Sequence, residues 1–293
     1  MKNSETSNAR LGLIASALIF GTIGLVKRYI PLPSSYVSLS RAVIGFAVLL
    51  VFQLARGKRP DMAAIKRNFI IILVSGAAIG FNWILLFEAY NYTSVAAATL
   101  CYYMAPLMVV LASPLLLKEK LSLRKVICVI IALVGMVLVN GTGAGENSAK
   151  GVIFGLAAAV LYASVMILNK KMKNIGAWDR TMTQMFTCAV VMLPYVLFTQ
   201  KTLAFDAPSL AWALLILLGI FHTGFAYALY FGSMAKLKAQ TVALLSYIDP
   251  AAAVLLSAVV LREDMGIWQI FGAVLIIVCA AASEIEVKKK TVK

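Results

Sequence analysis

Long runs of apolar residues are the feature that most constrains how this chain can fold. A helix of about 20 apolar residues is long enough to cross the roughly 30 Å hydrocarbon core of a bilayer. Ten such segments follow one another along the 293 residues, at 11–27, 36–55, 68–87, 94–117, 123–140, 151–169, 180–198, 209–231, 239–260 and 267–284. The connections between them are short, so we expect an all-α polytopic membrane protein with ten transmembrane helices and no separate soluble domain.

The composition agrees with this fold class and excludes others. Hydrophobic residues make up 62% of the chain and charged residues only 13%, whereas about a quarter of the residues are charged in an average soluble domain. The net charge of +15 comes from short clusters between the apolar runs rather than from one basic face, so no nucleic-acid partner is expected. The four cysteines lack the spacing of a metal site, and no metal or other cofactor is expected.

The distribution of positive charge predicts how the helices are oriented. With the N-terminus in the cytoplasm, 21 of the 27 lysines and arginines fall in inside segments and 5 in outside segments, while Arg41 lies within a predicted helix. This bias predicts cytoplasmic tails at 1–10 and 285–293, in a multi-pass protein of the inner (plasma) membrane. The first apolar run is longer than the core of a usual signal peptide, so we interpret it as a transmembrane helix.

The sequence also repeats itself after 144 residues. Between 80–119 and 224–263, 12 of 40 aligned pairs are identical. The match equates the third and fourth predicted helices with the eighth and ninth, which gives two repeats of five helices, at 11–145 and 146–284. Because five is odd, the second repeat enters the membrane inverted, a pattern typical of secondary transporters that bind their solute near the midplane.

Two segments of this repeat, 96–119 and 240–263, share a small-residue start, a proline in mid-helix and a closing glutamate. With these features and Arg41 in the second helix, the chain resembles the EamA family of the drug/metabolite transporter superfamily. The resemblance implies ten helices in two inverted repeats and export of an amino acid, metabolite or drug, although some members import. Glu88 and Asp249 depart from the family pattern, in which a neutral residue is usual at these positions.

Asp249 is the strongest candidate for a functional residue. It lies near the predicted midplane, where a charged side chain costs about 2.5–3.5 kcal/mol on insertion scales and therefore usually faces a cavity. Pro250 follows it and disrupts the local helical hydrogen bonds. We hypothesise that Asp249 binds a substrate ammonium or carries a coupling proton; a structural carboxyl capped by a hydroxyl is the alternative.

Three other ionisable residues have open interpretations. Arg41 could clasp a substrate carboxylate, pair with an acidic group, or extend to the outer headgroups. Glu88, at the outer end of the third helix, is either a solvated carboxylate or part of a gate or cation site. His222 is the only histidine and either relays protons or forms a structural hydrogen bond between helices.

Aromatic and amide residues complete the set of candidates. Tyrosines in mid-membrane need hydrogen-bond partners and can line a cavity, whereas those near helix ends can be interfacial anchors. The amides could bond substrate or neighbouring helices. The candidates of this kind are Tyr102, Tyr103, Tyr227, Tyr247, Trp83, Asn82 and Gln184. Pro106 and its repeat counterpart Pro250 are candidates for a gating role.

These features together predict a secondary transporter that moves a small organic solute by alternating access. The acidic midplane residue and the tyrosines favour an amino acid or a related zwitterion or cation. The alternatives are nutrient uptake, efflux of cationic drugs, a lipid-linked substrate and, from another class, an intramembrane enzyme. We expect a monomer in the lipid bilayer, with a dimer as the alternative. The chain has no GxxxxGK[ST] motif for ATP binding.

Overall fold

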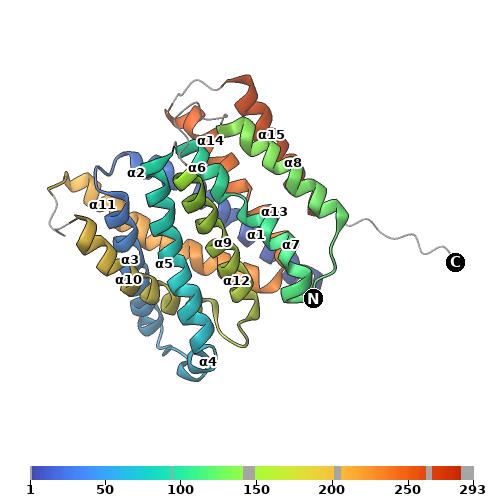
Figure 1. Ribbon diagram of the computed structural model, residues 1–293. Coiled ribbons are helices and arrows are strands. Elements are labelled where there is room, and N and C mark those ends of the chain that lie inside the picture. The colour runs from blue at the N-terminus through green and yellow to red at the C-terminus, as the bar shows by residue number, and fades with distance from the viewer. Residues whose placement is uncertain (1, 94, 141–148, 201–205, 262–265, 285–293) are drawn as a thin grey trace.

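The computed structural model describes residues 2–93, 95–140, 149–200, 206–261 and 266–284, which are helical and contain no strand (Figure 1). The helices of the first half are α1 (Lys2–Gly21), α2 (Ile23–Arg28), α3 (Ser34–Ala55), α4 (Met62–Arg67), α5 (Phe69–Tyr92), α6 (Val95–Tyr102), α7 (Ala105–Leu117) and α8 (Leu123–Asn140). Those of the second half are α9 (Ala149–Lys171), α10 (Ala177–Gln200), α11 (Ser209–Leu217), the π-helical turn η1 (Leu218–Phe225), α12 (Ala226–Lys236), α13 (Ala239–Leu245), α14 (Ile248–Leu261) and α15 (Ile267–Glu284).

A helix lies on each of the ten ranges predicted to cross the membrane, and six helical segments of the described chain are long and apolar enough to do so. These six are Glu5–Arg28, Ser34–Ala55, Phe69–Ala89, Ala149–Lys171, Ala177–Gln200 and Ser209–Lys236. The other four ranges hold helices that are shorter or broken into two pieces. The protein is therefore a polytopic helical membrane protein.

The helices pack as a central group flanked by two outer groups. In the centre, α5 packs along α9, and α1 packs against α12 and α14. One flank is the antiparallel pair α8 and α15, which is set apart on the right of Figure 1. The other flank is built by α3, α10 and α11. The central helices come from both halves of the sequence, so a site between them draws residues from both.

Glycines allow the closest of these contacts. A Cβ atom at Gly76 of α5 would lie 2.6 Å from the Cβ of Thr187 and 2.9 Å from the carbonyl oxygen of Gln184 in α10. A Cβ atom at Gly155 of α9 would lie 2.8 Å from the Cβ of Cys101 in α6. Small residues at such positions let helix backbones approach each other in a membrane, where packing replaces the hydrophobic effect as the driving force.

The outer surface of the bundle is apolar, as lipid contact requires. Leu115 and Phe198 are 85% and 83% exposed, respectively. Inside the bundle, Phe231 and Tyr247 are completely or almost completely buried. A soluble protein of this size would not leave so many large apolar side chains uncovered, whereas hydrocarbon tails cover them without cost.

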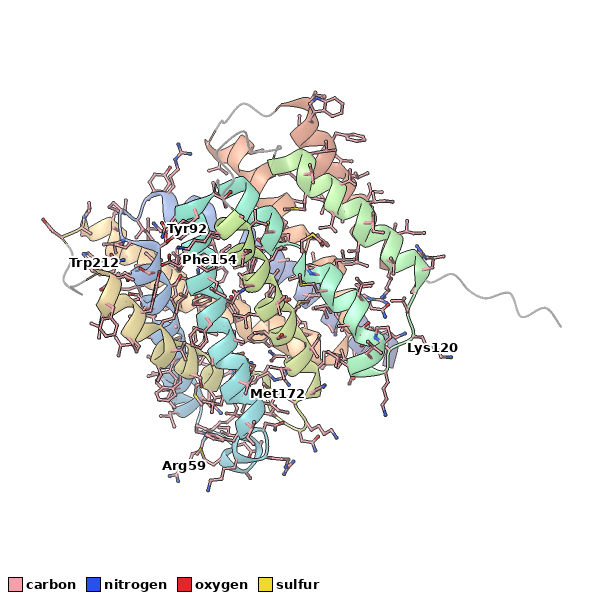
Figure 2. The ribbon with its side chains drawn as sticks, viewed as in Figure 1. Arg59, Tyr92, Lys120, Phe154, Met172 and Trp212 are labelled. Carbon is pink, nitrogen blue, oxygen red and sulfur yellow. The ribbon has the colours of Figure 1, made fainter. Side chains whose placement is uncertain are left out.

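Polar and aromatic residues mark the two ends of the bundle. Figure 2 shows Arg59 near the bottom of the molecule and Lys120 at its lower right, in connections that the charge pattern predicts to be cytoplasmic. Tyr92, Phe154 and Trp212 lie toward the opposite, upper left end. At that end the ammonium of Lys150 lies 4.0 Å from the centroid of the Tyr92 ring. Such aromatic residues are typical of the interface between membrane and water.

Candidate functional site

Two helices are broken at positions related by the sequence repeat. The first break separates α6 from α7 at Tyr103 and Met104, and the second separates α13 from α14 at Ser246 and Tyr247. Pro106 lies at the start of α7 and Pro250 at the start of α14. A proline is tolerated in the first turn of a helix, because the amide groups there have no partner within the helix. Each proline thus allows a new helix to begin inside the membrane.

The breaks leave backbone groups to be satisfied by other residues. The Tyr247 hydroxyl donates a hydrogen bond of 2.9 Å to the backbone carbonyl oxygen of Tyr103. Tyr103, in turn, donates its own hydroxyl proton to Oδ2 of Asp249, at 3.3 Å. These bonds tie the broken regions of the two halves to each other at the depth of Asp249.

A cavity of about 140 Å³ lies beside these breaks, between α1, α2, α3, α5, α6, α9, α12 and α14. Its lining carries one cationic, one anionic and one amide side chain, namely Arg41, Asp249 and Asn82. Most of the rest of the lining is aromatic: Phe20, Trp83, Tyr102, Tyr103, Tyr162, Tyr227, Tyr230 and Phe231. Seven of the residues predicted from the sequence are therefore brought together around one space, from both halves of the chain.

Arg41 is held with its guanidinium facing into the protein. Its Nε atom donates to the Thr223 hydroxyl at 3.0 Å, and that hydroxyl donates to the backbone of η1 at Leu218, at 3.1 Å. The guanidinium carbon lies 5.4 Å from the centroid of the Trp83 ring. Because the residue is only 9% exposed and lines the cavity, the geometry disfavours its predicted alternative of extending to the outer headgroups.

Two tyrosines of the lining, Tyr162 and Tyr230, were not among the residues predicted from the sequence. Their hydroxyl oxygens lie 3.2 Å apart, and Tyr230 also lies 3.1 Å from the Ser246 hydroxyl. Ser246 donates its single proton to the carbonyl oxygen of Val242, at 2.8 Å. The protons therefore run in one direction, from Tyr162 to Tyr230 to Ser246. Tyr230 follows Tyr227 by three residues on the same helix, a spacing that could have indicated it.

The remaining predicted residues do not line this cavity. Tyr247 is fully buried behind Tyr103. Gln184 is also fully buried, and its amide nitrogen donates to the Ser75 hydroxyl at 2.7 Å, between α10 and α5. Glu88 accepts a hydrogen bond of 2.6 Å from the Tyr195 hydroxyl near the end of α5. His222 is bonded through Nε2 to the Thr22 hydroxyl at 2.8 Å, at the junction of α1 and α2. These bonds join helices to one another.

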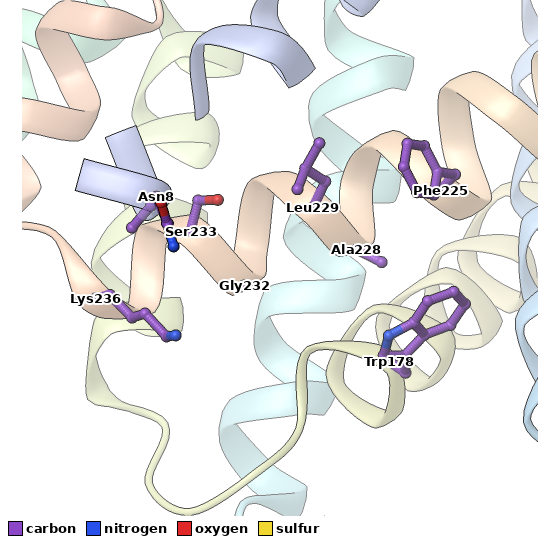
Figure 3. Close-up of a pocket in the computed structure, with 9 residues that line it drawn as sticks. Asn8, Trp178, Phe225, Ala228, Leu229, Gly232, Ser233 and Lys236 are labelled. Atoms are coloured by element: carbon purple, nitrogen blue, oxygen red, sulfur yellow. The ribbon is translucent and has the colours of Figure 1, made fainter. Parts of the chain in front are cut away.

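Two other cavities have a different character. One, of about 260 Å³, is a groove along α12, and Figure 3 shows Asn8, Ser233 and Lys236 toward one end of it and Trp178 and Phe225 toward the other. It contains none of the residues predicted to form the site. The second, of about 570 Å³, lies between α3, α10 and α11 and is almost wholly apolar. The cavity with Arg41 and Asp249 is therefore the candidate solute site.

A helical bundle with an apolar outer shell and a charged, aromatic-lined cavity inside it defines a polytopic membrane protein with an internal site. The sequence model of the EamA-like transporter family matches residues 8–141 and again residues 149–283. The chain belongs to this family and is a membrane transporter, which confirms the family resemblance inferred from its sequence.

Two known proteins similar to this chain are also named as transporters. An uncharacterized transporter of Bacillus subtilis, YxxF, is 28% identical over 280 residues, which is 94% of this chain and 89% of that protein. An uncharacterized transporter of Archaeoglobus fulgidus is 27% identical over 269 residues, covering 90% of this chain and 92% of its own. One crystal structure, titled only as that of a protein, is similar in fold, with a TM-score of 0.83 at 22% identity over 95% of this chain and 96% of the other.

Proposed function

We propose that this transporter moves a small zwitterion, of which an amino acid is the simplest kind, through the cavity between its two halves. The observation that carries this proposal is that Arg41 and Asp249 line the same cavity. A guanidinium binds a carboxylate by two parallel hydrogen bonds, and a carboxylate attracts an ammonium. Burial strengthens both interactions, because the low local dielectric weakens them less than water does. A solute that carries both charges would satisfy both residues at once.

The dimensions of the cavity support a small solute. Sites for drug-sized molecules usually measure about 300–1,000 Å³, and this cavity measures about 140 Å³. Efflux of cationic drugs of usual drug size, which the sequence left open, would require the cavity to expand substantially. A metabolite with only a few non-hydrogen atoms beyond its carboxylate and ammonium fits better.

For the mechanism, we propose alternating access between two inverted repeats of five transmembrane helices, 11–145 and 146–284. Hydrogen bonds between the halves support closure at the predicted cytoplasmic end. Glu119 accepts from the backbone amide of Ala239 at 2.9 Å, and Gln240 donates to the Ser113 hydroxyl at 3.0 Å. In the opposite state these bonds would break to open a path to the cytoplasm.

The remaining features of the proposal follow from charge and family. We place both tails in the cytoplasm, and the protein in the plasma membrane, because the lysines and arginines concentrate in the segments predicted to lie inside. Export is the direction that the family resemblance implies, with uptake as the alternative. A monomer suffices, because residues of a single chain line the cavity.

An intramembrane enzyme is the rival from another class. Such an enzyme would need paired catalytic groups at one depth, for which the sequence offered Asp249 and His222. In the structure, Asp249 lines the cavity and is bonded to Tyr103, whereas His222 is bonded to Thr22 outside the lining. This separation favours transport over catalysis.

Thermal unfolding of the purified protein with panels of solutes tests the proposal. A ligand at 100 times its Kd adds roughly 2.7 kcal/mol to the free energy of unfolding. Amino acids are expected to stabilise the wild type but not Asp249→Asn or Arg41→Gln. Asp206→Asn is the matched control, because that aspartate is exposed and lies away from the cavity. Uptake of the stabilising amino acid into proteoliposomes then measures its transport.

Two outcomes would contradict the proposal. In the first, only neutral solutes or phosphates stabilise the protein. In the second, amino acids stabilise the wild type and the Asp249→Asn variant to the same extent, which would place their binding elsewhere. Hydrolysis or transfer products formed from lipid substrates would support the enzyme instead.

A further inference from the structure

The wall around Asp249 is largely aromatic, and this narrows the kind of ammonium that fits there. The Tyr102 ring stacks on the Tyr162 ring, with centroids 5.2 Å apart and an interplanar angle of 10°. The Tyr103 ring meets Tyr102 edge to face at 5.5 Å. The Phe20 and Tyr230 rings also meet edge to face, with centroids 5.8 Å apart. These rings come from both halves of the chain and line the same cavity as the carboxylate of Asp249.

The hydroxyl protons of three tyrosines in this wall, Tyr103, Tyr162 and Tyr230, are already committed to protein partners. Tyr103 gives its proton to Asp249, and the protons of Tyr162 and Tyr230 pass along the chain that ends at Ser246. Oδ2 of Asp249 therefore already accepts one hydrogen bond before any solute arrives. These three hydroxyls therefore have no proton to donate to a solute, and the rings of the same residues line the cavity.

The two kinds of ammonium differ in what they need from such a wall. A primary ammonium brings three N–H donors, and each donor that leaves water without a new acceptor costs roughly 1–3 kcal/mol. A trimethylammonium has no N–H donor and spreads its charge over methyl groups, which aromatic ring faces attract by cation–π interaction. An aromatic wall around a single carboxylate satisfies the second group more completely than the first.

We propose that the cavity selects N-methylated ammonium zwitterions, compounds of the betaine class, over the corresponding primary amines. This inference rests on the proposed function and specifies its substrate class. Asp249 supplies the opposite charge, the rings of Tyr102, Tyr103, Tyr162 and Tyr230 hold the methyl groups, and Arg41 holds the carboxylate at the other side of the cavity.

The N-methylation series of glycine tests this selection while the carboxylate stays constant. The Kd of glycine, N-methylglycine, N,N-dimethylglycine and trimethylglycine is measured by calorimetry on the full chain in lipid nanodiscs. The Kd is expected to fall along the series, with trimethylglycine bound at least about tenfold more tightly than glycine. Asp249→Asn is expected to abolish binding of the whole series, whereas Asp206→Asn is expected to bind like the wild type.

A matched pair of variants at Tyr162 separates the ring from the hydroxyl. Tyr162→Phe keeps the ring and is expected to keep the preference for trimethylglycine, whereas Tyr162→Leu removes the ring and is expected to reduce that preference to about threefold or less. Melting temperatures of both variants show whether they are folded.

The possible failures are distinguishable. If glycine binds as tightly as trimethylglycine and binding depends on Asp249, the proposed function stands and the selection is wrong. If the preference survives in Tyr162→Leu, the aromatic wall is not its origin, which also overturns the inference. If no member of the series binds while other amino acids do, the betaine class is excluded but zwitterion transport is retained. If no zwitterion binds at all, both proposals fail together.

Discussion

The Tyr247 hydroxyl donates a hydrogen bond to the backbone carbonyl oxygen of Tyr103, its own counterpart 144 residues earlier in the sequence. The carbonyl lies where α6 ends and α7 begins, so the regular helical bonding does not continue through it. One repeat thus completes the backbone hydrogen bonding of the other, at the depth where the solute site lies.

Removing this bond should destabilise the protein measurably. Tyr247→Phe is expected to lower the free energy of unfolding by about 1–3 kcal/mol, because a buried carbonyl is left without its partner. Thermal unfolding in detergent measures the change. Tyr29→Phe is the control, since Tyr29 is 56% exposed and its loss should have little effect. Equal melting temperatures for Tyr247→Phe and the wild type would show that the carbonyl does not depend on this hydroxyl.

Arg41 should determine whether a carboxylate is recognised. Arg41→Lys keeps the positive charge but loses the two parallel donors, so the Kd of carboxylated solutes is expected to rise about tenfold. Binding of choline, which has no carboxylate, should be unchanged in the same variant. Calorimetry with trimethylglycine and choline provides the comparison, and Arg59→Lys, an exposed substitution, provides the control. A parallel loss for both ligands would mean that Arg41 maintains the fold rather than binding the carboxylate.

Close helix contact at Gly76 should make that position intolerant of a side chain. Gly76→Ala places a Cβ atom 2.6 Å from Thr187, and the resulting overlap is expected to cost about 1–3 kcal/mol. Gly24→Ala meets nothing within 4 Å, so it should be neutral or stabilise by up to about 1 kcal/mol, as alanine does in a helix. Melting temperatures of the two variants make the comparison. If Gly76→Ala melts no lower than Gly24→Ala, α5 and α10 are not in the close contact described above.

The bond between Glu119 and Ala239 should contribute to closure between the halves. Glu119→Ala removes a charged acceptor from the first turn of α13 and is expected to lower the free energy of unfolding by about 1.5–3 kcal/mol. Glu119→Gln keeps an acceptor oxygen and should lose roughly half as much. Guanidinium unfolding of both variants gives the magnitudes. Wild-type stability in Glu119→Ala would rule out this contribution.

The course of the chain was predictable because each helix carries its own signal in the sequence. Apolar length placed a helix on every predicted range, and Pro250 indicated one of the two places where a predicted helix is interrupted. The sequence could not show that α4 forms a separate short helix at Met62–Arg67 or that a π-helical turn occurs at Leu218–Phe225. Both depend on local backbone geometry and on contacts with other helices, which periodicity does not report.

The residues of the candidate site that could be predicted are those that carry a charge within a membrane-spanning segment. Asp249 and Arg41 were identified because a membrane segment tolerates a charge only where something faces it. Gln184 and His222 gave the same kind of signal, yet their partners are Ser75 and Thr22 between packed helices. Residue type alone does not report which face of a helix meets the cavity. For the same reason Tyr162 was missed, since a tyrosine within a long apolar run is compatible with lipid, core or cavity.

Asp249 has an alanine, Ala105, as its counterpart in the other repeat. If each repeat adopted the conformation that the other now has, the two conformations of the protein would therefore differ in their contacts at Asp249. In the present conformation, the Tyr103 hydroxyl donates to the carboxylate of Asp249, and the Tyr247 hydroxyl donates to the backbone carbonyl of Tyr103. After the exchange, Tyr103 would donate to the backbone of Tyr247, and Tyr247 would face a methyl group. Asp249 would then be left with no tyrosine donor competing for its charge. Under the proposed alternating-access mechanism, the affinity of Asp249 for a cation would therefore differ between the state open to one side of the membrane and the state open to the other.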